Sequence, residues 1–205
     1  MIELFGSALV TFLVIIDPPG CAPIFASLTR GTDPRHRRAM AIRASLIAWA
    51  ILMFFGLLGR PMLQALGISL ASFRIAGGVM LFMIALDMVF ERRTQRREDR
   101  ANSIEGTPEA EDISVFPMAI PMIAGPGSIA SAMLWVSRAD GSAEVAVVLA
   151  AITVVILLTM LALLAAGPIM RLIGEKLEAM ITRVLGVILA ALAGQFVIDG
   201  LKQSF

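Results

Sequence analysis

The stretch Asp17-Pro18-Pro19-Gly20 constrains the fold most strongly, because it interrupts an apolar run that begins near Ile2. Proline lacks an amide hydrogen, and inside a helix its ring clashes with the carbonyl one turn back. Two prolines, a glycine and then Pro23 therefore predict two half-helices, restarting near Gly20 and joined by an unwound segment that carries a carboxylate. In a bilayer such a break persists only where it is buried in protein or lines a watery cavity. The first candidate site residues are therefore Asp17, Pro18, Gly20 and Cys21.

A second interruption, Gly125-Pro126-Gly127-Ser128, lies inside another apolar run in the second half of the chain. Interrupted hydrophobic segments at corresponding places in two halves are the best sequence indication of a transporter binding site at a repeat interface. We therefore add four residues to the candidate substrate site: Gly125, Pro126, Gly127 and Ser128.

The composition indicates a polytopic membrane protein. Of the 205 residues, 58% are hydrophobic and 16% are charged, whereas soluble domains are about half apolar and about a quarter charged. A membrane-spanning helix needs about 20 mostly apolar residues. By that measure the chain has six spans, at 2–29, 39–59, 68–90, 114–137, 145–166 and 184–201, of which the first and fourth are broken.

The two halves align in one register, which predicts an internal repeat. Pro18 aligns with Pro126, and the motif that contains Arg74 and Gly77 aligns with the one that contains Arg183 and Gly186. Each unit has three spans, an odd number, so the second unit would enter the membrane from the opposite side. The sequence thus predicts an all-α fold of two inverted three-helix repeats, 1–90 and 114–205, joined by a charged cytoplasmic loop at 91–113.

The basic residues set the expected orientation, because cytoplasmic loops of membrane proteins are rich in Lys and Arg. Of the 17 basic residues, 13 fall on the side that holds the loops after spans one, three and five. We therefore expect both termini in the periplasm. The stretch 91–113 has no apolar periodicity, and we expect it to be a solvated loop with no chemical role.

The two breaks together favour a zwitterionic ligand. Half-helix N-termini present unpaired amide hydrogens and a positive dipole end, which attract an anion such as a carboxylate. Asp17 could receive an ammonium group or a coupling proton; the alternative is that it only caps the following half-helix. With a single histidine and no Walker, zinc or Ser-His-Asp pattern, we expect no enzyme, no cofactor and no metal.

Three motifs resemble the signatures of the MarC family of bacterial and archaeal inner-membrane proteins. They are Asp17-Pro18-Pro19-Gly20-Cys21-Ala22-Pro23-Ile24-Phe25, Phe73-Arg74-Ile75-Ala76-Gly77-Gly78, and Phe116-Pro117-Met118-Ala119-Ile120-Pro121 with its continuation to Ile129. The likeness covers essentially the whole chain and departs from the usual pattern at Pro19 and Cys21. It implies a six-span protein of the broad clan of LysE-type exporters, in which some relatives are described as transporters of small neutral amino acids.

We therefore expect a secondary transporter, an exporter of amino acids such as alanine and glycine, that works by alternating access around the paired breaks. The expected partners are the small amino acid, a coupling proton and the bilayer, with self-association left open and no nucleic acid. One alternative is a drug or stress-metabolite efflux protein. The other is a regulatory or scaffolding membrane protein that docks partners through residues 91–113.

Overall fold

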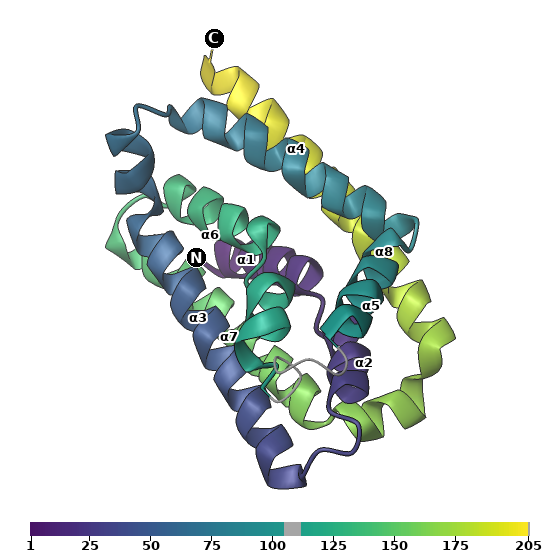
Figure 1. Ribbon diagram of the computed structural model, residues 1–205. Helices are drawn as coiled ribbons and strands as arrows, with labels where there is room; N and C mark the ends of the chain where they lie inside the picture. Colours follow the sequence, from purple (N-terminus) through teal and green to yellow (C-terminus); the bar gives the residue numbers. More distant parts are fainter. Residues whose placement is uncertain (105–111, 205) are drawn as a thin grey trace.

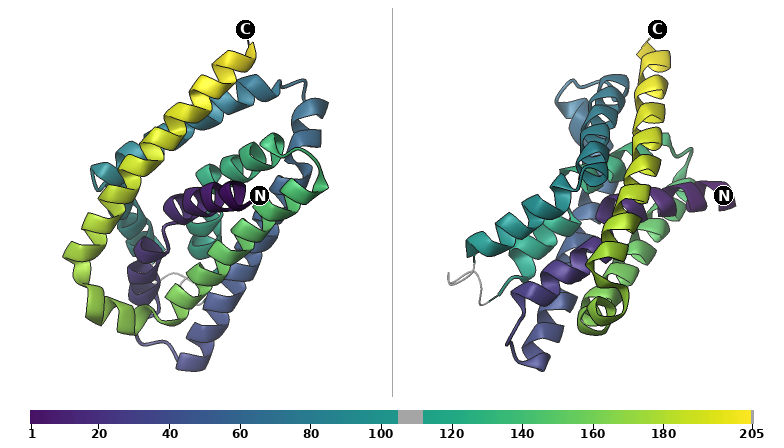
Figure 2. Two further views of the ribbon diagram at one scale, coloured as in Figure 1. Left: turned by 180° about the vertical axis from the view of Figure 1, so that it is seen from behind. Right: turned by 90° about the vertical axis from the view of Figure 1, so that its right-hand side faces the viewer.

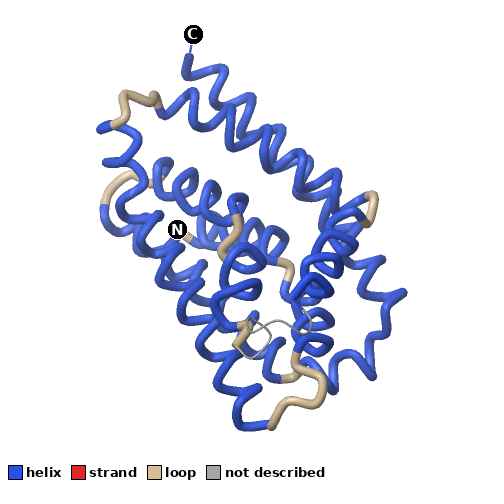
Figure 3. The backbone as a smooth tube through the Cα atoms, viewed as in Figure 1, coloured by secondary structure: helices blue, strands red, loops and turns tan. Residues whose placement is uncertain are grey.

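The chain is all-helical throughout the part that the structure, a computed structural model, describes: residues 1–104 and 112–204. Figures 1 and 3 show helices joined by short turns, with no strand in those residues. The predicted all-α class is confirmed. In chain order the elements are α1 (Ile2–Ile16), α2 (Pro18–Leu28), α3 (Pro34–Ala65), α4 (Leu70–Val89), α5 (Arg92–Ile104), η2 (Ser114–Ile123), α6 (Pro126–Arg138), α7 (Ser142–Leu164) and α8 (Ala166–Ser204).

The number of membrane spans agrees with the prediction. Five helical segments are long and apolar enough to cross a bilayer, and a sixth is added when η2 and α6, bent by 54°, are counted as one broken span. Large apolar side chains such as Phe54, Phe82 and Val187 are exposed on the outer helices α3, α4 and α8. Such a surface is unusual for a soluble protein and suits contact with lipid. The inverted relation of the two halves stays a prediction.

The first break is shorter than expected. α1 ends at Ile16 and α2 begins at Pro18, so Asp17 alone is unwound. The predicted restart near Gly20 is wrong because prolines are tolerated in the first turn of a helix, where the backbone N–H has no intrahelical partner. Pro23 also lies inside α2.

The second break is longer than expected. The sequence predicted a regular helix from residue 114, but η2 has wide turns, and Phe116 and Ile120 have extended backbone angles. Each of these residues precedes a proline, and steric contact with the proline ring moves the preceding residue out of the helical region. The regular helix α6 begins at Pro126.

α1 and α2 lie at the centre of the molecule. In the most apolar window of residues 2–28, 72% of the residues are buried. In the corresponding windows of α3 and α4, 33% and 28% of the residues are buried. Figure 1 shows α1 behind α6, with α3 and α7 on one side and α4 and α8 on the other. The broken segment is thus enclosed by protein, as a break within a membrane requires.

The C-terminal half of α8 lies beside α4 in both views of Figure 2. α8 begins at Ala166, well before the predicted sixth span, and runs on to Ser204. Glycines allow the close approach: a Cβ on Gly78 would lie 2.7 Å from Val197 Cγ2 and 2.9 Å from the Ala193 carbonyl oxygen. Small residues thus allow the two helices to pack closely here.

The connection between the halves contains a helix that the sequence analysis did not predict. Residues 92–104 form α5, whereas we expected a loop over 91–113. Arg, Gln, Glu and Ala have high helix propensities, so an amphipathic apolar pattern is not required for this segment to be helical. The rest of the predicted loop, residues 105–111, lies outside the described residues.

We expect Gly78→Ala to destabilise the protein by about 1–3 kcal/mol, because the added methyl group overpacks the α4–α8 contact. The matched control is Gly194→Ala on α8, where a Cβ would have no atom within 4 Å. There the higher helix propensity of Ala should leave stability unchanged or raise it by up to about 1 kcal/mol. Thermal unfolding of the detergent-purified variants measures both; equal melting temperatures would contradict the packing role.

Candidate functional site

Asp17 connects the two half-helices through its backbone and its side chain. Its φ of 57° and ψ of 67° lie in the left-handed region, which Asp tolerates better than most residues. Its N–H donates to the Leu13 carbonyl at the end of α1, and its carboxylate accepts from the Gly20 N–H at 3.2 Å. The predicted capping role of Asp17 is therefore confirmed.

The Asp17 carboxylate is also part of a buried ion pair. Arg97 of α5 donates through Nη1 to Asp17 Oδ2 at 3.0 Å, and the two side chains are 7% and 1% exposed. Gly20 is needed beside this pair, because a Cβ there would lie 2.2 Å from Asp17 Oδ2 and 2.7 Å from Arg97 Nη1. A buried carboxylate of this kind is tolerated only when it is paired and hydrogen-bonded.

Two arginines of α5 also contact the C-terminal end of α1. Arg97 Nη2 donates to the Ile16 carbonyl at 3.3 Å, and Arg93 Nη2 donates to the Ile15 carbonyl. The last carbonyls of a helix have no intrahelical donor and carry its negative dipole end, so cations are stabilising there. The break in the first span is thus held by charge from a helix outside the candidate spans.

Arg93 stays charged at neutral pH despite its surroundings. Burial, and next the neighbouring Arg97 cation, lower the pKa of the Arg93 guanidinium to about 10, while the Asp17 carboxylate acts in the opposite direction. The guanidinium is therefore protonated under physiological conditions. The region around the first break keeps two positive charges that face one carboxylate.

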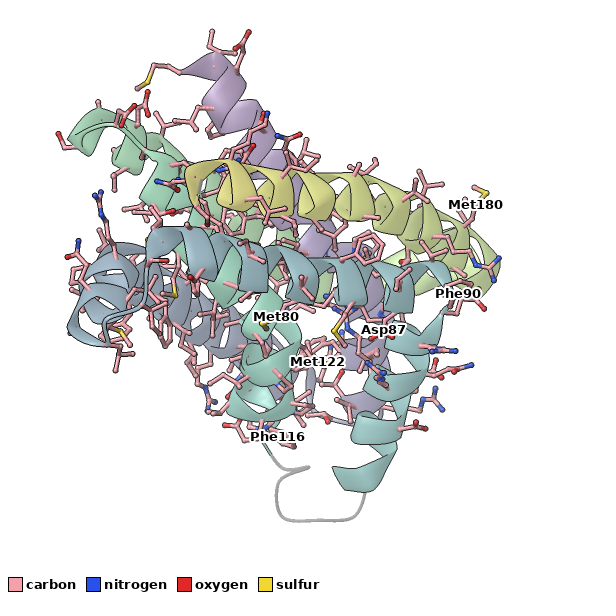
Figure 4. All side chains as sticks on the ribbon, turned by 90° about the horizontal axis from the view of Figure 1, so that it is seen from above. Met80, Asp87, Phe90, Phe116, Met122 and Met180 are labelled. Atoms are coloured by element: carbon pink, nitrogen blue, oxygen red, sulfur yellow. The ribbon has the colours of Figure 1, made fainter. Side chains whose placement is uncertain are left out.

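A cavity of about 280 Å³, which we call the basic cavity, lies next to this charged cluster. In Figure 4, two of its residues, Asp87 and Met122, lie between α4, η2 and α5. The residues that line it come from α1, α4, α5, η2 and the start of α6. They are Ile15, Ile84, Asp87, Arg93, Arg96, Arg97, Pro121, Met122, Gly125, Pro126, Gly127 and Ser128.

The charged groups that line the basic cavity are mostly cations, with one carboxylate among them. Three of its lining residues are arginines, and the single lining acid, Asp87, is paired with Arg96. The N-terminus of α6 adds a positive dipole end at Pro126. Both signs of charge are therefore present within one small cavity.

The glycines of the second break let neighbouring protein atoms pack closely against its backbone. A Cβ on Gly127 would lie 2.4 Å from Ile84 Cδ1, and a Cβ on Gly125 would lie 2.4 Å from the Pro121 carbonyl oxygen. Ser128 is buried and donates through its hydroxyl to the Ile123 carbonyl at 2.8 Å. At the second break a neutral hydroxyl thus donates to a free helix carbonyl, whereas at the first break guanidinium groups donate to the free carbonyls.

The predicted site residues divide into two groups. Gly125, Pro126, Gly127 and Ser128 all line the basic cavity. Asp17, Pro18, Gly20 and Cys21 lie one layer behind it, and all four are buried. The groups are linked by Ile15 and Arg97, which line the cavity and also contact the first break.

Sequence reasoning missed the arginines of α5, because it assigned no chemistry to residues 91–113. A signal was present: Arg93 and Arg97 are four residues apart, so they share one face of any helix formed there. Arg92 and Arg96 repeat the spacing on an adjacent face. Pairs of cations at this spacing could have indicated a helix that binds carboxylates.

Comparison with known proteins settles the family. The family model described as "MarC family integral membrane protein" matches residues 2–205, nearly the whole chain. The chain belongs to the MarC family. This confirms the resemblance carried by the three sequence motifs.

Relatives of this MarC protein occur in archaea and bacteria. A UPF0056 membrane protein of Methanocaldococcus jannaschii is 35% identical over 201 residues, which cover 98% of this chain and 97% of the relative. The UPF0056 inner membrane protein YhgN of Escherichia coli is 32% identical, with 96% and 95% covered. The UPF0056 membrane protein YvbG of Bacillus subtilis is also 32% identical, with 96% and 93% covered. No solved structure matches the chain.

The predicted location is confirmed by the same comparison. This MarC protein is a multi-pass membrane protein by its apolar helices, and the E. coli relative is named an inner membrane protein. The predicted periplasmic placement of both termini is not tested by these findings and stays a prediction.

We expect Arg97→Gln to destabilise this MarC protein by about 3–5 kcal/mol, because it leaves the Asp17 carboxylate buried without its cation. The double variant Asp17→Asn/Arg97→Gln removes both charges and should recover much of that loss. Arg92→Gln on the exposed face of α5 is the control, with an expected change within about 0.5 kcal/mol.

A double-mutant cycle on thermal unfolding in detergent measures the coupling between Asp17 and Arg97. Additive effects of the two single substitutions would contradict a functional ion pair at the break.

Proposed function

We propose that this protein is a secondary transporter that exports small neutral amino acids across the inner membrane. The observation that carries the proposal is the basic cavity, a small space lined by three arginines, the N-terminus of α6 and one carboxylate. An amino acid carries one group of each charge. The proposal also draws on what the family resemblance implies for MarC-like proteins.

The substrate carboxylate would bind at the N-terminus of α6, beside Gly127 and Ser128. The early N–H groups of a helix have no intrahelical acceptor, and an anion at that place is stabilised by them and by the dipole. Arg93 lines the same cavity and stays protonated at neutral pH. Gly127 lets the ligand approach the backbone closely.

The substrate ammonium would face Asp87, the acid that lines the basic cavity. Asp17 was the sequence-based candidate for this role and for proton coupling, but its carboxylate is already engaged by Arg97 and the Gly20 N–H. Asp87 is paired with Arg96, whose side chain is 66% exposed and so can move away at low cost. In this proposal Asp17 holds the site together, and Asp87 contacts the ligand.

The basic cavity is small. Its volume of about 280 Å³ lies at the lower end of the range of about 300–1,000 Å³ that is typical of sites for drug-sized ligands. The choice of amino-acid transport over the drug-efflux alternative therefore rests on the charges of the cavity. The scaffolding alternative needs residues 91–113 to be available for a partner, whereas Arg93 and Arg97 of that stretch are used inside the protein.

The proposed direction of transport is export, which requires the basic cavity to load from the cytoplasm. α5 belongs to the arginine-rich connection that the distribution of basic residues places in the cytoplasm. A cavity lined by α5 would therefore load from the cytoplasm, as an exporter requires. Alternating access would then expose the same site to the periplasm.

The test is flux of labelled alanine and glycine in proteoliposomes. We expect flux by the wild type and its loss in Gly127→Leu, because the added side chain would overlap Ile84 and displace this cavity-lining residue. Asp87→Asn should weaken the apparent affinity for the amino acid by about tenfold or more, the effect of losing a charge-assisted hydrogen bond of about 1.5–3 kcal/mol.

Gly194→Ala, which lies away from the site and meets no atom within 4 Å, is the transport control. Each variant is first checked for a monodisperse gel-filtration profile and a cooperative thermal unfolding transition. Wild-type protein that is folded but moves neither amino acid under an imposed proton gradient would refute the proposal.

A further inference from the structure

Four polar side chains of α6 lie along one face of the helix. They are Ser128, Ser131, Trp135 and Arg138, spaced three, four and three residues apart. At 3.6 residues per turn they fall within an arc of about 80°. We call this set the polar stripe. From Ser128 to Arg138 it extends for about 15 Å at a rise of 1.5 Å per residue, about half of a hydrocarbon core of about 30 Å.

The two ends of the polar stripe have partners of different kinds. Ser128 lines the basic cavity and donates its hydroxyl to the Ile123 carbonyl. Arg138, at the far end, forms an ion pair with Asp199 of α8, with the two side chains 23% and 29% exposed. The guanidinium carbon of Arg138 also lies 4.2 Å from the centre of the Phe196 ring. One end is thus at the cavity and the other reaches the surface.

The middle of the polar stripe is unusual, because two buried polar groups have no protein partner among the described residues. They are the Ser131 hydroxyl and the Trp135 indole N–H, in side chains that are 0% and 6% exposed. Buried donors and acceptors are almost always hydrogen-bonded, and each orphan costs about 1–3 kcal/mol. Ser131 and Trp135 are four residues apart and therefore adjacent on the helix surface.

Resting on the transporter function proposed above, we propose that the polar stripe is the translocation path between the basic cavity and the periplasmic side. In another state of the transport cycle, water and the polar groups of the substrate satisfy Ser131 and Trp135. The ligand class is a small solute that both donates and accepts hydrogen bonds, as an amino acid does. The Arg138–Asp199 pair is the outer end of this path.

The neighbouring serine of α6 shows that a buried hydroxyl on this helix need not be an orphan. Ser137 is 8% exposed, lies on a different face from the polar stripe, and donates its hydroxyl to the Leu134 carbonyl at 2.7 Å. Back-bonding of this kind is the ordinary solution for a serine inside a helix. Ser131 does not use it, which suits a hydroxyl that is required for another partner.

The test is labelling of engineered cysteines by a membrane-impermeant methanethiosulfonate reagent in proteoliposomes. The wild type, whose only cysteine is the buried Cys21, gives the background. We expect Ser131→Cys to be labelled above that background and Ser137→Cys to remain at it. Ser142→Cys, at an exposed position at the start of α7, is the positive control for the reagent.

Two outcomes would overturn the path. One is no labelling of Ser131→Cys while Ser142→Cys reacts, and the other is equal labelling of Ser131→Cys and Ser137→Cys, which would indicate general loosening of α6. A second variant covers the case in which Ser131→Cys does not fold. Trp135→Phe keeps the ring contact with Phe196 but removes the N–H, and it should lower alanine flux by about two- to tenfold. Unchanged flux in this variant would overturn the path.

The labelling result does not depend on the identity of the substrate. Labelling at residue 131 without alanine or glycine flux would uphold the path and refute the amino-acid proposal. Flux without labelling at residue 131 would uphold the amino-acid proposal and refute the path.

Discussion

The buried ion pair between Asp17 and Arg97 is the interaction on which the rest of the structure depends. A helix that breaks inside a membrane exposes unpaired carbonyls and amides that lipid cannot satisfy. At this break one carboxylate caps α2, and two guanidinium groups cover the last carbonyls of α1. Forming such a buried pair contributes little net free energy to folding, but removing one partner leaves an unpaired buried charge and destabilises the protein strongly. α5 is therefore an integral part of the membrane domain, although by composition it resembles a solvated linker.

The same arginines connect the structural role of the break to the proposed function. Arg93 and Arg97 hold the first break and also line the basic cavity beside the second. A ligand carboxylate would therefore compete with the α1 carbonyls and Asp17 for the same guanidinium groups. A shift of α5 could in this way be coupled to occupancy of the cavity, because a ligand moves an equilibrium only through its different affinity for two states.

The sequence was sufficient to locate both breaks but not to describe how they are closed. Apolar runs interrupted by Pro18 and Pro126 mark the broken spans, since proline effects are local and depend only on the chain. The contact between Arg97 and Asp17 joins residues 80 positions apart; the four-residue spacing of Arg93 and Arg97 indicates a basic helix face but does not identify Asp17 as its partner. The unwound length was wrong for a local reason: prolines begin a helix as readily as they end one.

The two breaks are closed differently, and this difference bears on how transport would occur. At the first break, charged groups fill the space around Asp17 and leave it buried. At the second, the Ser128 hydroxyl covers the Ile123 carbonyl, and Gly125 and Gly127, which line the cavity, let Pro121 and Ile84 approach the helix start closely. The cavity therefore lies at the second break, at the foot of α6. α6 continues from that point, and its Ser131 and Trp135 have no hydrogen-bond partner among the described residues. A polar solute could therefore move along α6 from the second break, which carries no charged group of its own.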